Sequence, residues 1–235
     1  VGGDKVDVLV LVEPGQSPHS WEPRPSQMEA LSGSGAWIIT GMEFEHGLVP
    51  KVRDLYQNMK IVEGFAGVTL RHLEEHHHEG EEEHEGEEGH EGEEGMDPHT
   101  WLGNQGALAQ LAAARDVLTA LDPAAKDMYQ ANHDAAVARV NQVFADLRTK
   151  LAPLSGRSVL VYHPAFGYFL DDFGLTQIAI ETGGKEPGPR TLEAIIAEAR
   201  EENAAVVFVQ KQFPTAAANT VADALGAQVV ALDDL

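Results

Sequence analysis

The chain has 235 residues, no cysteine and a formal charge of −22. Its length suits one large domain or two small ones, and the lack of cysteine excludes disulfides and thiolate metal ligands. No run of about 18 apolar residues is present that could span a bilayer as a helix. The negative charge argues against nucleic acid as a partner and favours a cationic ligand.

Strand-like and helical patterns alternate through the first half of the chain. The expected strands are residues 6–12, 36–40 and 59–62, and the expected helices are residues 26–31, 46–57 and 104–121. Asp122 and Pro123 then begin a long helix to about Leu151, with apolar residues at spacings of three, four and seven. About 30 residues at 1.5 Å each make a rod of roughly 45 Å, which we interpret as a rigid connector.

Beyond Pro153 the alternation of strands and helices resumes. The expected strands are 158–162, 175–180, 205–209 and 227–232, and the expected helices are 166–173, 191–202 and 214–225. Repeated β-α units with apolar strands predict mainly parallel sheets covered by helices. The predicted fold is therefore α/β, with two lobes joined by one long rigid helix. Its parts are an N-terminal α/β lobe at 1–121, a linking helix at 122–153 and a C-terminal α/β lobe at 154–235.

The segment 71–95 has an unusual composition, with twelve Glu, six His and one Arg. It supplies −11 of the formal charge, and the rest of the chain carries the other −11. So polar a segment cannot offset its ordering entropy, and we expect a mobile loop. Its histidines form a secondary, weak metal-binding set of His72, His76, His77, His78, His84 and His90. The alternative is an acidic solubilising loop in which these histidines are incidental.

Potential metal ligands follow the predicted strands, where open α/β sheets bind their ligands. His19 lies one loop after the first expected strand, whereas His163 and Asp233 directly follow later ones. His99 lies where the Glu/His segment rejoins the fold. A single histidine in a proline-flanked loop is more often a surface or capping residue. The evidence for a metal site is therefore the location that the three histidines and Asp233 share. Three imidazoles and one carboxylate would suit tetrahedral zinc.

Three motifs surround the candidate histidines. They are Gly-Gln-Ser-Pro-His-Ser-Trp-Glu-Pro at 15–23, Asp-Pro-His-Thr-Trp-Leu at 97–102 and Tyr-His-Pro-Ala-Phe-Gly-Tyr-Phe at 162–169. Gly-Lys-Glu-Pro-Gly-Pro at 184–189 and the Glu/His segment add two further features, and the resemblance that they carry together extends over nearly the whole chain. In these features the chain resembles the zinc and manganese solute-binding proteins of bacterial ABC transporters, particularly the zinc-specific branch.

The resemblance implies a Zn2+ ion held in the cleft between two lobes by His19, His99 and His163. Manganese-binding members tend to have a carboxylate at the third position, so an imidazole there favours zinc. The family's acidic fourth ligand falls on Asp233, although the neighbouring Asp234 replaces the usual proline. Asp234, Glu181 and water are the alternatives for this fourth position.

The resemblance also implies a function. The protein is expected to capture zinc outside the cytoplasm, in the periplasm or on a lipid anchor, and to deliver it to an ABC transporter permease in the inner membrane. A monomer is expected. The family's first strand and helix, its last helix and a signal segment are missing, so the chain is interpreted as a trimmed piece.

Other functions remain open at this stage. A manganese or iron solute-binding protein would have the same fold, and a zinc-buffering adhesin would leave no distinguishing motif. A zinc metallohydrolase would need an open metal position and a base. Four protein ligands would close the site, so no enzymatic activity is expected. Residues 72–76 match the zinc-protease motif H-x-x-E-H. In a segment so rich in Glu and His such a match is expected by chance, so it is not evidence for a protease.

The remaining polar and aromatic candidates have simple structural interpretations. Glu22, Glu43 and Glu45 are interpreted as hydrated surface or loop carboxylates rather than general bases. His46 and His133 are interpreted as solvated helix residues. Four aromatic residues flank the candidate ligands and are expected to pack the ligand loops, namely Trp21, Trp101, Phe166 and Tyr168.

Overall fold

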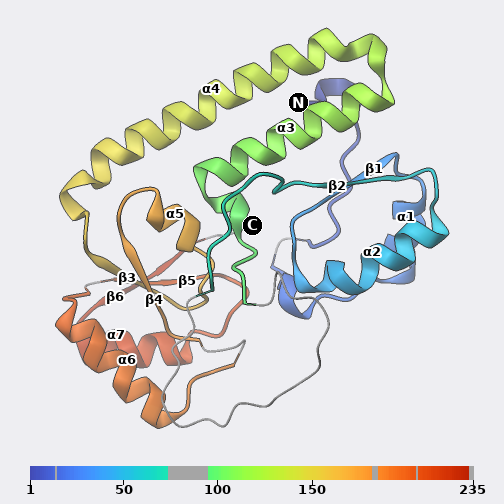
Figure 1. The fold of residues 1–235 in the computed structure, drawn as a ribbon. Helices are drawn as coiled ribbons and strands as arrows, with labels where there is room; N and C mark the ends of the chain where they lie inside the picture. The colour runs from blue at the N-terminus through green and yellow to red at the C-terminus, as the bar shows by residue number, and fades with distance from the viewer. Residues whose placement is uncertain (14, 74–94, 182–184, 205, 233–235) are drawn as a thin grey trace. The chain divides into compact units, whose positions relative to one another are not determined.

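The structure is a computed structural model that describes residues 1–13, 15–73, 95–181, 185–204 and 206–232. It divides into two compact units (Figure 1). The first unit comprises residues 1–69 and 98–151, and the second comprises residues 70–97 and 152–235. Every strand pair within the two sheets is parallel, so the predicted α/β class with parallel sheets is confirmed.

The first unit contains a two-stranded sheet and four α-helices. Its elements are α1 (Pro25–Ser32), β1 (Ala36–Ile39), α2 (Glu43–Leu55), β2 (Lys60–Glu63), α3 (Asn104–Leu121) and α4 (Lys126–Leu151). Strands β1 and β2 pair with Ala36 opposite Lys60. Trp37, Leu48 and Val52 belong to the core that α1 and α2 build with this sheet. Helix α4 packs along α3 (Figure 1).

The long helix is present, and its start follows the capping chemistry in the sequence. The Asp122 carboxylate accepts a hydrogen bond from the amide of Ala124 at 3.2 Å and so caps a short 3-10 turn, Pro123–Ala125. Helix α4 then runs for 26 residues, and Tyr129 and Phe144 are its buried side chains. Its contacts assign α4 to the first unit. Its role as a connector stays a prediction.

The predicted strand at residues 6–12 is wrong. This segment forms no β-ladder with any described residue, and β1 and β2 pair only with each other. Val8 and Val10 are 81% and 59% exposed, although Leu11 is buried. An apolar, β-branched run becomes a strand only where a partner supplies hydrogen bonds to its backbone, and the sequence pattern cannot report that partner.

The second unit is a four-stranded parallel sheet with strand order β4-β3-β5-β6. Its elements are β3 (Ser158–Val161), α5 (Gly167–Asp171), β4 (Thr176–Ala179), α6 (Pro189–Glu201), β5 (Val206–Val209), α7 (Ala216–Leu225) and β6 (Gln228–Ala231). Helices α6 and α7 pack against each other (Figure 1) and supply Ile195 and Val221 to a core with Leu160 and Val207 of the sheet. The β-α alternation predicted for this half is confirmed, with elements one or two residues shorter at most ends.

No helix within the described residues is both long enough and apolar enough to cross a membrane.

Candidate metal centre

His19 lies in a short proline-initiated turn of the first unit. Pro18–Ser20 form one 3-10 turn, and the next residue, Trp21, is buried edge-on against Phe44 of α2 with ring centroids 4.8 Å apart. This packing fixes the turn close to the start of α2. The Nδ1 atom of His19 lies 3.2 Å from a carboxylate oxygen of Glu43, the first residue of that helix.

The contact between His19 and Glu43 changes the acidity of the carboxyl group. The hydrogen bond with His19 is the main cause that lowers the pKa of Glu43 from 4.5 to about 2, against the opposing effect of partial burial. The positive charges that His19 and His99 carry when protonated lower this pKa further. Glu43 is therefore a carboxylate at neutral pH. When it accepts the Nδ1 proton of His19, the lone pair of that ring is at Nε2.

His99 is buried in the same unit. Its side chain is 1% exposed, and its ring centroid lies 5.5 Å from that of His19 and 5.3 Å from that of Trp101. Helix α3 approaches this loop so closely that a Cβ atom at Gly106 would overlap the carbonyl of Thr100. A glycine is therefore required at this position of α3, and it lets the helix support the loop that carries His99. Within the first unit, the structure brings His19 and His99 together.

His163 is placed by the register of the second sheet. Residues of β3 pair with residues of β4 that are 18 positions later, and with residues of β5 that are 47 positions later. His163 lies two residues after the end of β3. If the same offsets continue there, Glu181 lies on one side of His163 and Gln210 on the other. The Nδ1 atom of His163 lies 3.1 Å from Glu181 Oε1, and both side chains are buried.

Two further buried contacts hold His163. The Gln210 side chain donates to the carbonyl of His163 at 3.1 Å and accepts from its amide at 3.4 Å. The ring of Phe213 stacks on the imidazole, with centroids 4.8 Å apart and an interplanar angle of 27°. Sequence reasoning missed Gln210 and Phe213. The rule that pointed to His163 also applies to Gln210, because Gln210 directly follows β5.

Some predicted site residues cannot be placed. Asp233 and Asp234 lie outside the described residues, as do five histidines of the Glu/His segment, His76, His77, His78, His84 and His90. Of that segment's histidines, His72 alone is described, and it forms an antiparallel bridge with Met96. The roles assigned to all of them stay predictions.

The interpretation of Glu45 as a hydrated surface carboxylate is wrong. Glu45 is 3% exposed, and its Oε2 atom accepts hydrogen bonds from the amides of Thr40, Gly41 and Met42 at 2.7–3.0 Å. Burial raises the pKa of Glu45, and these amide bonds oppose that shift. Its role is to cap the N-terminus of α2, two residues after Glu43.

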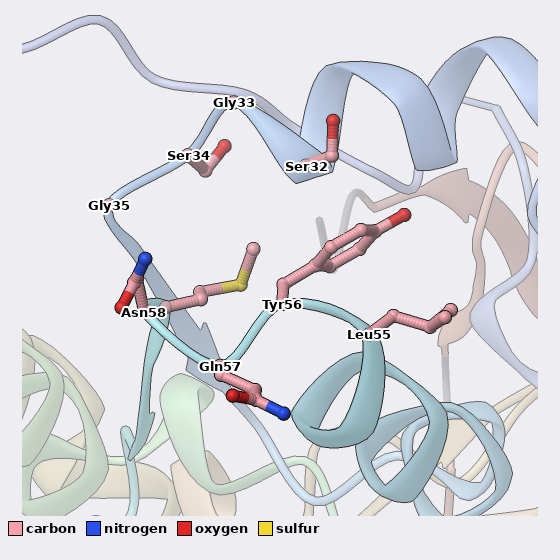
Figure 2. Close-up of a pocket in the computed structure, with 9 residues that line it drawn as sticks. Ser32, Gly33, Ser34, Gly35, Leu55, Tyr56, Gln57 and Asn58 are labelled. Atoms are coloured by element: carbon pink, nitrogen blue, oxygen red, sulfur yellow. The ribbon is translucent and has the colours of Figure 1, made fainter.

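The first unit also has an open hollow of about 470 Å³ at the C-terminal ends of α1 and α2 (Figure 2). Residues 32–35 and 55–59 line it. Two of its hydroxyl groups are already used locally, because Ser32 donates to the carbonyl of Glu29 and Tyr56 donates to that of Met28. The hollow contains no histidine or carboxylate, so it has none of the chemistry of a metal site.

His19 and His163 each have Nδ1 close to a carboxylate oxygen, an arrangement typical of histidines that bind metals. Comparison with known proteins makes the class specific. The family model described as "ZnuA: Zinc-uptake complex component A periplasmic" matches residues 1–235. The chain belongs to this family of solute-binding proteins, which is not a family of enzymes, and the resemblance seen in the sequence is confirmed.

Individual relatives agree with this assignment. The high-affinity zinc uptake system protein ZnuA of Yersinia pestis is 31% identical over 241 residues, covering 96% of this chain and 75% of the relative. The protein of the same name from Bacillus subtilis is 28% identical over 235 residues, covering 99% and 72%. A crystal structure of ZnuA superposes with a TM-score of 0.87 at 34% identity, covering 100% of this chain and 85% of that one.

Proposed function

We propose that this protein captures Zn2+ with high affinity outside the cytoplasm and delivers it to an ABC importer. His19, His99 and His163 are proposed as ligands of one ion. The observation that carries the proposal is that two of these histidines, in separate units, each have Nδ1 on a carboxylate. A carboxylate in that position fixes the tautomer with its lone pair at Nε2 and makes the imidazole a better ligand, an arrangement widespread in zinc proteins.

The nature of the side chains favours zinc as the cargo. Three imidazoles suit zinc better than manganese, which prefers oxygen ligands. The relatives from Yersinia pestis and Bacillus subtilis are named as high-affinity zinc uptake proteins. Asp233 is proposed as the fourth ligand. We assign Glu181 the separate role of orienting His163, because one of its oxygens already lies 3.1 Å from Nδ1.

The ligand assignment is tested by His99→Ala with His133→Ala as its matched control. His133 also has Nδ1 close to a carboxylate, 2.9 Å from Asp134, but it lies on α4, outside the ligand loops. Calorimetric titration with a competing chelator should show that tight zinc binding is lost in His99→Ala and kept in His133→Ala. Unchanged tight binding in His99→Ala would refute the assignment.

The delivery step requires a partner in the membrane. The family's zinc-uptake complex implies an ABC permease; the family description reads periplasmic, and two relatives are named as lipoproteins. Zinc-loaded protein should stimulate ATP hydrolysis by its permease in proteoliposomes, whereas the His99→Ala variant should not. Equal stimulation by both would argue against zinc-dependent delivery.

Manganese capture is the second candidate, because a manganese-binding lipoprotein of Halalkalibacterium halodurans is 24% identical over 227 residues. A competition assay with both ions at equal concentration separates the two functions, and a preference for manganese would decide for the second.

For the Glu/His segment we propose a weaker, collecting role. Deletion of residues 74–94 should leave the tight site intact, and loss of that site would overturn this division.

A further inference from the structure

Arg71 is the centre of a compact polar cluster in the second unit. Its Nη1 atom donates to Asp97 Oδ2 at 3.2 Å, and its Nε atom lies 2.9 Å from Asp171 Oδ2. The Asp97 side chain is fully buried, and the Arg71 side chain is 15% exposed. An arginine that reaches two carboxylates through different nitrogens fixes both in position, which a lysine with its single ammonium group does less well.

The backbone reinforces this cluster. The phenol of Tyr168 accepts a hydrogen bond from the amide of Arg71 at 3.2 Å and donates to the carbonyl of Asp97 at 2.9 Å. The amide of Asp97 donates to the carbonyl of Arg71 at 2.9 Å. A Cβ atom at Gly167 would overlap the guanidinium of Arg71, so only glycine permits this close approach at the first residue of α5.

The chain connects this cluster to two proposed ligands. Asp97 is two residues before His99, and Gly167 is four residues after His163. Arg71 therefore joins the segment that leads into one ligand loop to the helix that follows another.

We propose that Arg71 is a positioning residue for zinc binding, and this inference rests on the proposed function above. By joining Asp97 to Asp171, the last residue of α5, Arg71 limits the conformations open to the loop that carries His99. Ligands held in advance bind a metal more tightly because less ordering remains to be done on binding. Loss of this anchor should weaken zinc binding without removing any ligand.

The test is the double variant Arg71→Gln/Asp97→Asn, which replaces the ion pair by two amides. The single change Arg71→Gln would leave a buried carboxylate without its cation and would destabilise the fold for that reason alone. The zinc dissociation constant of the double variant should rise by about 10-fold to 100-fold, the range found when groups that orient metal ligands are replaced. The d–d absorption of the cobalt-substituted protein, which reports coordination geometry, should change as well. Affinity is compared at a temperature where circular dichroism shows each metal-free variant fully folded.

The matched control is Arg115→Gln, which breaks an exposed ion pair with Asp116 on α3 and should change neither zinc affinity nor the cobalt spectrum. Arg71→Lys should recover only part of the affinity. Wild-type affinity and an unchanged cobalt spectrum in the folded double variant would overturn the proposal. If that variant does not fold, Tyr168→Phe replaces it, and an unchanged affinity and spectrum there would also overturn it. The His99→Ala variant separates failure of this proposal from failure of the ligand assignment. If the ligand assignment is wrong, His99→Ala keeps tight zinc binding, independently of the result for the Arg71 variants.

Discussion

The two histidines that contact carboxylates differ in how much solvent surrounds them. In the first unit, the side chains of His19 and Glu43 are 26% and 59% exposed. In the second unit, those of His163 and Glu181 are 6% and 5% exposed. The distances between the paired atoms are nearly equal, 3.2 and 3.1 Å. Water and dissolved ions weaken the exposed pair much more than the buried one, so similar geometry should give different energies.

The two pairs also differ in what holds them in place. Glu181 stands beside His163 because the register of β3 and β4 continues past the strands, and Gln210 holds the histidine from the other side. Glu43 meets His19 because Trp21 packs on Phe44. His19 itself lies in one short 3-10 turn, Pro18–Ser20, which no strand register holds in place. The comparison indicates that His163, a proposed ligand in the second unit, is fixed in advance, whereas His19, a proposed ligand in the first, is easier to move.

The largest expected effects come from removing the two imidazoles. His163→Ala and His19→Ala should both lose tight zinc binding, since each removes a proposed ligand. Only His163→Ala should also lower the unfolding free energy of the metal-free protein, by about 1–3 kcal/mol, because it leaves the buried Glu181 without its partner. Urea denaturation of the metal-free proteins measures this difference. Equal loss of stability in both variants would contradict the contrast drawn above.

A smaller effect is expected when the carboxylates are replaced. Glu181→Gln should weaken zinc binding by about 10-fold to 100-fold, because a neutral amide orients His163 less strongly and makes it a poorer ligand. Glu43→Gln should have an effect of less than about 10-fold, since solvent already screens that contact. Chelator competition on both variants gives the ratio. A larger loss in Glu43→Gln than in Glu181→Gln would reverse the comparison.

Much of this architecture could be predicted from the sequence because its signals are local. Apolar runs separated by amphipathic segments predicted the parallel second sheet, and Asp122 with Pro123 predicted where the long helix begins. The strand predicted at 6–12 failed because strand formation depends on a partner that lies elsewhere in the chain. The interpretation of Glu45 is wrong for another reason, because composition does not show that its carboxylate accepts hydrogen bonds from the nearby amides of Thr40, Gly41 and Met42.

The site could be predicted only in part. Proline-flanked loops and strand ends pointed to His19, His99 and His163, but the residues that hold them come from other segments. Glu181 and Gln210 become neighbours of His163 only through the strand register, which composition does not report. Arg71 lies at the edge of a segment so rich in charge that no pattern separates it from its surroundings.

The smallest effect we predict concerns the acidity of Glu43. Its pKa is about 2, below the ordinary 4.5, so its contribution to stability is fully present above pH 4.5 and is lost as the pH falls through about 2. His19→Ala removes the main cause of this shift and should return the pKa of Glu43 toward 4.5. Carbon-13 NMR titration of the side-chain carboxyl groups measures this directly. Glu45 is the internal control, because burial raises its pKa, nearby amides oppose that shift, and its pKa should not respond to the loss of His19. A pKa that stays near 2 in His19→Ala would mean that the exposed pair is not what acidifies Glu43.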